Sequence, residues 1–71
     1  MTIKTLTYIH NLLIEDVKTQ TNAKDYTRTI ADKAEAEEAP NAEYLRKQQR
    51  IAFDKYLKAT RALEDFEAKE W

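Results

Sequence analysis

The sequence contains two pairs of glutamates. Within each pair the residues are three positions apart, a spacing that places both carboxylates on one face of a helix. Glu35 and Glu38 form the first pair, and Glu64 and Glu67 form the second. Helical-bundle enzymes hold Mg²⁺ or paired iron ions with such carboxylates, and the iron sites add a Glu-x-x-His motif that this chain lacks. A metal-dependent helical-bundle hydrolase is therefore our third hypothesis for function, and solvated helix faces explain the same glutamates more simply.

His10 is the only histidine, and histidine is the side chain whose type titrates near neutral pH. It recurs at helical spacing with Leu6 and Leu13, which is typical of a histidine at the edge of a core. In a helical hairpin it would approach Glu67 or Glu70 and form a structural ion pair. The chain has no Cys, no Ser and no Gly, which removes thiol and serine nucleophiles and Gly-rich phosphate loops. We expect no enzyme activity, no catalytic residue, no cofactor and no bound metal.

Basic residues are concentrated in one segment of the second half of the chain. The candidate basic face comprises Arg46, Lys47, Arg50, Lys58 and Arg61. Basic residues interspersed with aromatic ones, here Tyr44 and Tyr56, can bind nucleic acid. Acidic segments flank this region on both sides, and docking to an acidic protein partner explains it equally well. A nucleic-acid-associated regulator that uses the Arg46–Arg61 face is the alternative hypothesis, which the sequence disfavours.

Length and composition predict one helical domain over residues 1–71. The charge is balanced, with 12 basic and 13 acidic residues, and 42% of residues are hydrophobic, which is too apolar for a disordered acidic tail. The absence of Gly and the presence of ten Ala favour an all-α fold. A chain of this size buries only about 60% of its unfolded surface. Without Cys for disulfides, association between subunits is the remaining means of stabilisation.

No apolar run approaches the ~18 residues that would suggest a membrane span. The longest uninterrupted apolar run near the N-terminus is Leu12-Leu13-Ile14, which is too short for the core of a signal peptide. We therefore expect a soluble cytoplasmic protein without membrane contact.

The segment from Tyr44 to Trp71 predicts a long amphipathic helix. Its apolar residues recur within a stripe about 80° wide at the helical ~100° per residue. They are Leu45, Ala52, Tyr56, Ala59, Leu63 and Phe66. Pro40, the only proline, places a turn at Ala39–Asn41. The sequence thus predicts an antiparallel hairpin of helices over about 2–38 and 41–70, in which residues whose numbers sum to about 80 face each other.

The first helix has two interpretations. Thr19–Asn22 is its weakest helical stretch, since Thr and Asn are poor in helix interiors. Either one helix runs through this stretch, which we favour, or it breaks near Thr21 and gives a three-helix monomer. Beyond the stretch, the apolar face turns by about a third of a turn relative to that of the first half. This rotated face comprises Ala23, Tyr26, Ile30 and Ala34.

Several large apolar residues lie outside the stripes that a hairpin can cover. They are Ile51, Phe53, Leu57 and Trp71 in the second helix, with Leu12 and Ile14 in the first. Burying each of them is worth roughly 1.5–3 kcal/mol, and monomers seldom expose such patches. We therefore expect self-association into a four-helix bundle, as a homo-oligomeric dimer or tetramer. The favoured function is a protein–protein interaction or scaffolding module, with a further protein partner as an additional expectation.

Overall fold

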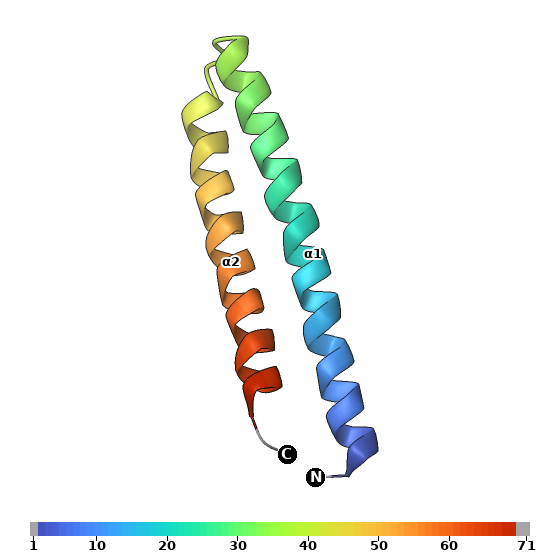
Figure 1. Ribbon diagram of the computed structural model, residues 1–71. Helices are drawn as coiled ribbons and strands as arrows, with labels where there is room; N and C mark the ends of the chain where they lie inside the picture. Colours follow the sequence, from blue (N-terminus) through green and yellow to red (C-terminus); the bar gives the residue numbers. More distant parts are fainter. Residues whose placement is uncertain (1, 70–71) are drawn as a thin grey trace.

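The computed structural model describes residues 2–69, which form two long helices joined by a short turn (Figure 1). Helix α1 comprises Ile3–Ala36 and helix α2 comprises Ala42–Ala68. The helices run antiparallel, so the start of α1 and the end of α2 lie at the same end of the molecule. The predicted all-α antiparallel hairpin is confirmed.

Helix α1 is continuous through Thr19–Asn22. Thr21 Oγ1 donates a hydrogen bond to the Val17 carbonyl oxygen at 2.7 Å, and Thr27 Oγ1 donates to that of Ala23 at 2.8 Å. These hydroxyl groups bond to the preceding turn of their own helix instead of competing with it. The continuous helix is therefore confirmed, and the alternative with a break near Thr21 is excluded.

Both helices begin after a residue that favours a helix start. Thr2 is the N-cap of α1, where its Oγ1 accepts a hydrogen bond from the backbone N–H of Thr5 at 3.2 Å. Asn41 is the N-cap of α2, directly after Pro40, and its side chain makes no capping hydrogen bond. Glu43 lies in the first turn of α2, where a carboxylate interacts favourably with the helix dipole.

Helix α1 ends with a capping motif that normally uses glycine. The backbone N–H of Ala39 donates to the Ala34 carbonyl oxygen at 2.9 Å, and that of Glu38 donates to Glu35 at 3.1 Å. This is the Schellman pattern, in which one residue adopts a left-handed conformation. Glu38 takes that position with φ 53°. The motif ends α1 at Ala36, two residues before the predicted boundary.

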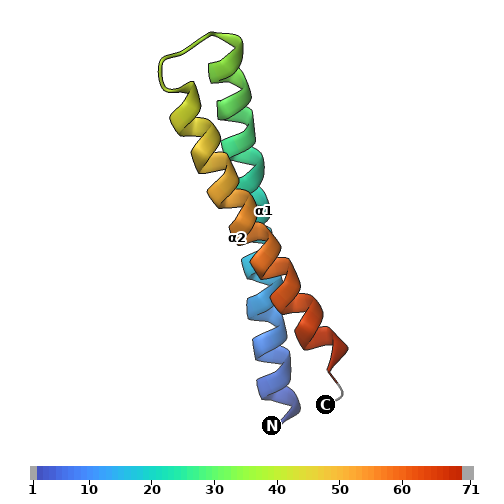
Figure 2. The same cartoon turned by 90° about the vertical axis from the view of Figure 1, so that its left-hand side faces the viewer.

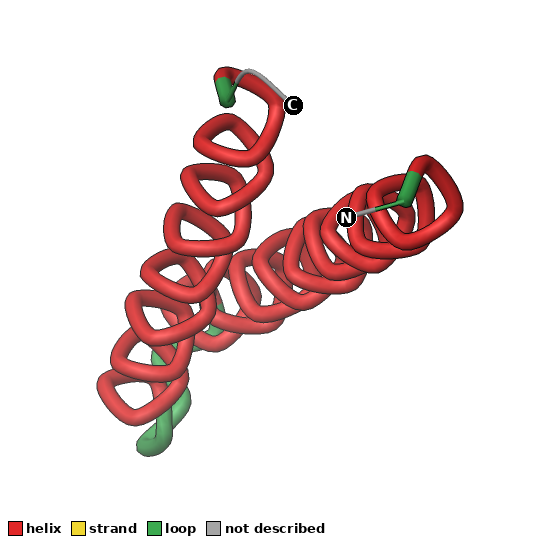
Figure 3. The backbone as a smooth tube through the Cα atoms, turned by 90° about the horizontal axis from the view of Figure 1, so that it is seen from below, coloured by secondary structure: helices red, strands yellow, loops and turns green. Residues whose placement is uncertain are grey.

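The side chains between the helices recur in alternating steps of three and four residues. We call this set the seam, and its members are buried or half-buried. In α1 it comprises Leu6, His10, Leu13, Val17, Gln20, Lys24, Thr27, Ala31 and Ala34. In α2 it comprises Leu45, Gln49, Ala52, Tyr56, Ala59, Leu63 and Phe66. This heptad spacing is typical of helices that wind around each other, and Figures 2 and 3 show the two helices crossing.

The structure confirms the apolar stripe predicted for α2, all of which lies in the seam. The rotated apolar face of the second half of α1 lies beside the seam instead of within it, except at Ala34. Tyr26 is 67% exposed, while Lys24 and Thr27 lie in the seam. Lys24 Nζ is 4.6 Å from the centroid of the Tyr56 ring across the hairpin. The heptad spacing continues through these polar residues because two supercoiled helices keep the same face toward each other.

The hairpin has a thin core. The buried side chains among residues 2–69 are four alanines, Ala31, Ala34, Ala52 and Ala59, and no large side chain there is fully buried. The molecule measures 53 × 15 × 12 Å, with a radius of gyration of 16.3 Å. A compact chain of this length would have a radius of gyration of about 11 Å. The small alanines let the helices approach closely, and the elongated shape leaves most side chains in contact with solvent.

Candidate interaction surface

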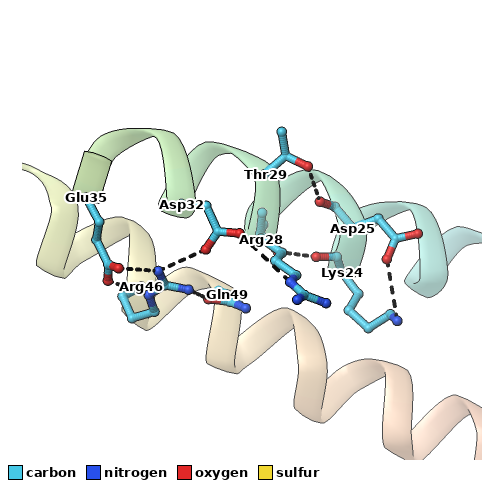
Figure 4. A network of polar contacts seen from close by, with 9 residues as sticks. Lys24, Asp25, Arg28, Thr29, Asp32, Glu35, Arg46 and Gln49 are labelled. Atoms are coloured by element: carbon cyan, nitrogen blue, oxygen red, sulfur yellow. Dashed lines mark hydrogen bonds and ion pairs between the residues drawn. The ribbon is translucent and has the colours of Figure 1, made fainter. Parts of the chain in front are cut away.

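Arg46 of α2 binds two carboxylates of α1 near the turn (Figure 4). Its Nε donates to Glu35 Oε1 at 2.7 Å, and its Nη2 lies 2.6 Å from Glu35 Oε2 and 3.0 Å from Asp32 Oδ1. Its Nη1 also donates to Gln49. The two parallel contacts to Glu35 form a bidentate pair, the strong form of this interaction. The hydrogen bond from Arg46 lowers the pKa of Glu35 below its ordinary value of 4.5, and the same contacts raise the pKa of Arg46.

We call Arg46, Asp32 and Glu35 the arginine cluster, and it changes how the candidate basic face is interpreted. The charge of Arg46 is matched by two carboxylates, and its side chain is only 26% exposed. The other members of the face, Lys47, Arg50, Lys58 and Arg61, are exposed on the outer surface of α2. Asp54 is exposed within the same arc of the helix. This surface therefore has mixed charge, with four basic side chains around one carboxylate.

The predicted glutamate pairs have different surroundings. Glu38 lies in the turn beyond the end of α1, and Glu35 is engaged by Arg46, so these two do not share a helix face. Glu67 Oε2 lies 3.2 Å from His10 Nε2, and the His10 ring stacks on Phe66 with a centroid distance of 5.7 Å. The predicted approach of His10 to Glu67 is confirmed. Residues 2–69 contain no group of three or more side chains arranged to hold a metal ion.

Most of the predicted interaction residues are exposed. Between 40% and 52% of the surface of each of four residues is accessible: Leu12, Ile51, Phe53 and Leu57. Ile14 is half-buried beside the seam. Trp71 lies outside the described residues, as does Glu70. The structure therefore leaves four of the six predicted side chains available for contact with another molecule.

Four further apolar side chains are exposed, none of them among the predicted interaction residues. They are Ile3, Tyr8, Tyr26 and Tyr44, each more than 60% exposed. Extending the three- and four-residue steps from Leu6 to Ala34 would have put Tyr26 outside, because that count places Lys24 and Thr27 in the seam. Ile3 precedes Leu6 by three residues and so continues the seam spacing, yet it is 83% exposed at the start of α1, while Tyr8 and Tyr44 give no comparable signal.

The exposed apolar residues divide between the two edges of the hairpin. We call the edge that carries Arg46 the arginine side. Phe53 and Leu57 follow Arg46 by seven and eleven residues, so they lie on that edge of α2. We call the other edge the tyrosine side, which carries Tyr26 and Ile30 of α1 and, on the opposite flank of α2 from Phe53, Ile51.

Comparison with known proteins gives no match: no protein-family model, no curated protein and no solved structure is similar to this chain. Neither described helix combines the length and the apolar character needed to cross a membrane. Function must therefore be inferred from the surfaces of the hairpin itself, and their most distinctive feature is the set of exposed apolar residues along the two edges.

Proposed function

We propose that this protein is a protein–protein interaction or scaffolding module that acts as a homo-oligomer. The observation that carries the proposal is the large exposed surface of the hairpin. The chain exposes 5739 Å² of accessible surface. Size scaling gives roughly 4,600 Å² for a compact chain of this mass. The difference, about 1,100 Å², exceeds the ~800 Å² that each partner typically buries in a stable complex.

The thin core also supports self-association. Alanines bury little apolar surface, and the seam contains polar side chains such as Gln20, Lys24 and Gln49. Small domains with so little buried surface are marginally stable on their own. Covering a single exposed side chain such as Leu12 or Phe53 would add up to roughly 1.5–3 kcal/mol. A second copy is the simplest source of that cover, because it is present wherever the chain is made.

Nucleic-acid binding has less support than protein contact. The side chain with the most favourable geometry for binding phosphate, Arg46, already holds Asp32 and Glu35 in the hairpin. Asp54 lies among the remaining basic residues and would repel phosphate groups. The net charge of the chain is −1, which provides no overall attraction for a polyanion.

Thermal unfolding tests the proposal. The melting temperature should be followed by the loss of helicity over a roughly hundredfold range of protein concentration, and for an oligomer it rises with concentration. Resistance to urea-induced unfolding should likewise be greater at the high end of the concentration range than at the low end. A melting temperature that stays constant across the range would show that the chain folds as a monomer and would overturn the proposal.

A further inference from the structure

Helix α1 carries a second stripe beside the seam, on the tyrosine side. It recurs in the same three- and four-residue steps and comprises Ile9, Leu12, Thr19, Ala23, Tyr26 and Ile30. Asp16 completes the spacing between Leu12 and Thr19 and is the single charged residue on the stripe itself. Helix α2 leaves the stripe largely uncovered, since Leu12 is 52% and Tyr26 is 67% exposed. A helix with two such stripes has the pattern of a bundle helix that contacts two neighbours.

The matching edge of α1 on the arginine side is polar and already engaged in ion pairs. Lys18 Nζ lies 3.6 Å from Glu15 Oε1, and Arg28 Nε lies 3.9 Å from Asp32 Oδ2. Docking another helix there would remove these charges from water, which is unfavourable without new partners. Docking along the second stripe would remove one charged side chain of the stripe, Asp16, from water, and Ile51 extends the tyrosine side onto α2.

The second stripe is symmetric about its centre. Leu12 and Tyr26 each lie seven residues from Thr19, and Ile9 and Ile30 lie ten and eleven residues from it. When two copies of a helix pack antiparallel about a two-fold axis, each residue meets one equally far from the axis on the other side. Large side chains therefore meet large ones, and the small Thr19 and Ala23 allow close approach at the centre.

We propose that a second copy of this chain docks on the tyrosine side, with the two α1 helices antiparallel and the two-fold axis near Thr19. This inference rests on the proposed homo-oligomeric function and names the surface and the orientation that it uses. The product is a four-helix bundle in which α1 contacts α2 through the seam and the other α1 through the second stripe.

Charge complementarity supports this orientation. In the antiparallel pair, Asp16 lies at the level of the partner's Ala23. Across the hairpin, that level corresponds to Leu57 of α2, because facing residue numbers sum to about 80 in this hairpin, and Lys55 lies two residues away on the tyrosine side. No ion pair of Lys55 is formed within residues 2–69, and Asp16 only accepts a hydrogen bond from Gln20 at 3.3 Å. The one charged residue of the stripe thus lies at a level within one helical turn of an opposite charge on the other copy.

A single introduced cysteine tests the two-fold axis, because the chain has no Cys of its own. Under mild oxidation, Thr19→Cys should form a covalent dimer, since two copies of a residue at the axis lie close together. Lys18→Cys, on the adjacent residue and the arginine side, is the matched control and should remain monomeric in a denaturing gel. Equal or faster cross-linking of the control, or no cross-linking of Thr19→Cys, would overturn the inference.

Charge insertion tests the choice of side. Both Tyr26 and Leu57 are exposed in the hairpin, so Tyr26→Asp and Leu57→Asp leave the seam intact. Tyr26→Asp should raise the dimer dissociation constant by about 100-fold or more, because it places an unpaired charge in the interface, whereas Leu57→Asp should change it by less than about threefold. Circular dichroism of each variant checks that the hairpin still forms.

The outcomes separate this inference from the proposed function. If Leu57→Asp dissociates the dimer and Tyr26→Asp does not, the arginine side is the interface, and self-association stands while the inference falls. If neither variant affects a dimeric parent chain, the inference falls in the same way. If the parent chain itself is monomeric, both the inference and the proposed function are wrong.

Discussion

At the scale of single residues, Glu38 occupies the position where a glycine would be least strained. Its φ of 53° lies in the left-handed region, which costs a residue with a Cβ atom about 1–2 kcal/mol relative to the right-handed one. Glu38→Gly should therefore stabilise the hairpin by about 0.5–1 kcal/mol, after allowing for the greater freedom of glycine in the unfolded chain. Urea unfolding measures the change. Glu38→Gln keeps the Cβ atom and removes the charge, so a gain of the same size in that variant would contradict the conformational explanation.

Arg46 and Glu35 make hairpin stability depend on pH in the acidic range. Because Arg46 lowers the pKa of Glu35 in the folded chain, the carboxylate contributes its full stabilisation above the unfolded value and loses it as the pH falls through the lower folded value. The stability difference between the parent chain and Arg46→Gln should be complete at neutral pH and shrink as the pH falls below about 4. Arg50→Gln is the control. If the stability difference between the parent chain and Arg50→Gln showed the same pH dependence, the pH effect could not be assigned to the pair of Arg46 and Glu35.

At the scale of the helices, the hairpin depends on alanines that keep α1 and α2 close together. Ala31 has no exposed surface, so Ala31→Leu should force the helices apart and lower the free energy of unfolding by about 1–3 kcal/mol. Ala36→Leu makes the same change at an exposed position of α1 and should alter that free energy by less than about 0.5 kcal/mol. Equal effects of the two substitutions in urea unfolding would show that the seam is not closely packed at Ala31.

Helix α2 was easier to predict from the sequence than α1, and the reason is chemical. Apolar residues fill six of the seven seam positions of α2, so apolar periodicity alone identifies its buried face. In the second half of α1, Lys24 and Thr27 occupy seam positions while Tyr26 and Ile30 lie beside them. A search for apolar periodicity therefore selects the wrong face there.

The arginine cluster and the composition of the two edges could not be predicted from periodicity, for a different reason. Arg46 meets Asp32 and Glu35 only because the exact register of the hairpin brings two elements together. Position on one helix follows from periodicity alone, which is sufficient to place Phe53 and Leu57 on one flank of α2 and Ile51 on the other. Which flank of α1 lies beside each of these residues depends on the register of the hairpin, which periodicity does not determine.

At the scale of the whole molecule, the hairpin is a rod 53 Å long with a thin core. Figure 3 shows that the axes of the two helices are inclined to each other, and the two edges differ in residue type. The arginine side of α1 is held by ion pairs within the hairpin, and the tyrosine side presents a stripe that α2 covers only in part. The central prediction for the whole molecule is therefore that a second chain covers that stripe.

The mass in solution tests this central claim most directly. Light scattering should be measured over a roughly hundredfold range of protein concentration, with helicity followed in parallel. We expect a mass of at least twice the 8.4 kDa of one chain, falling toward that value only on dilution. A well-folded species of 8.4 kDa at every concentration would contradict it, and the exposed edges would then be surfaces for a different protein.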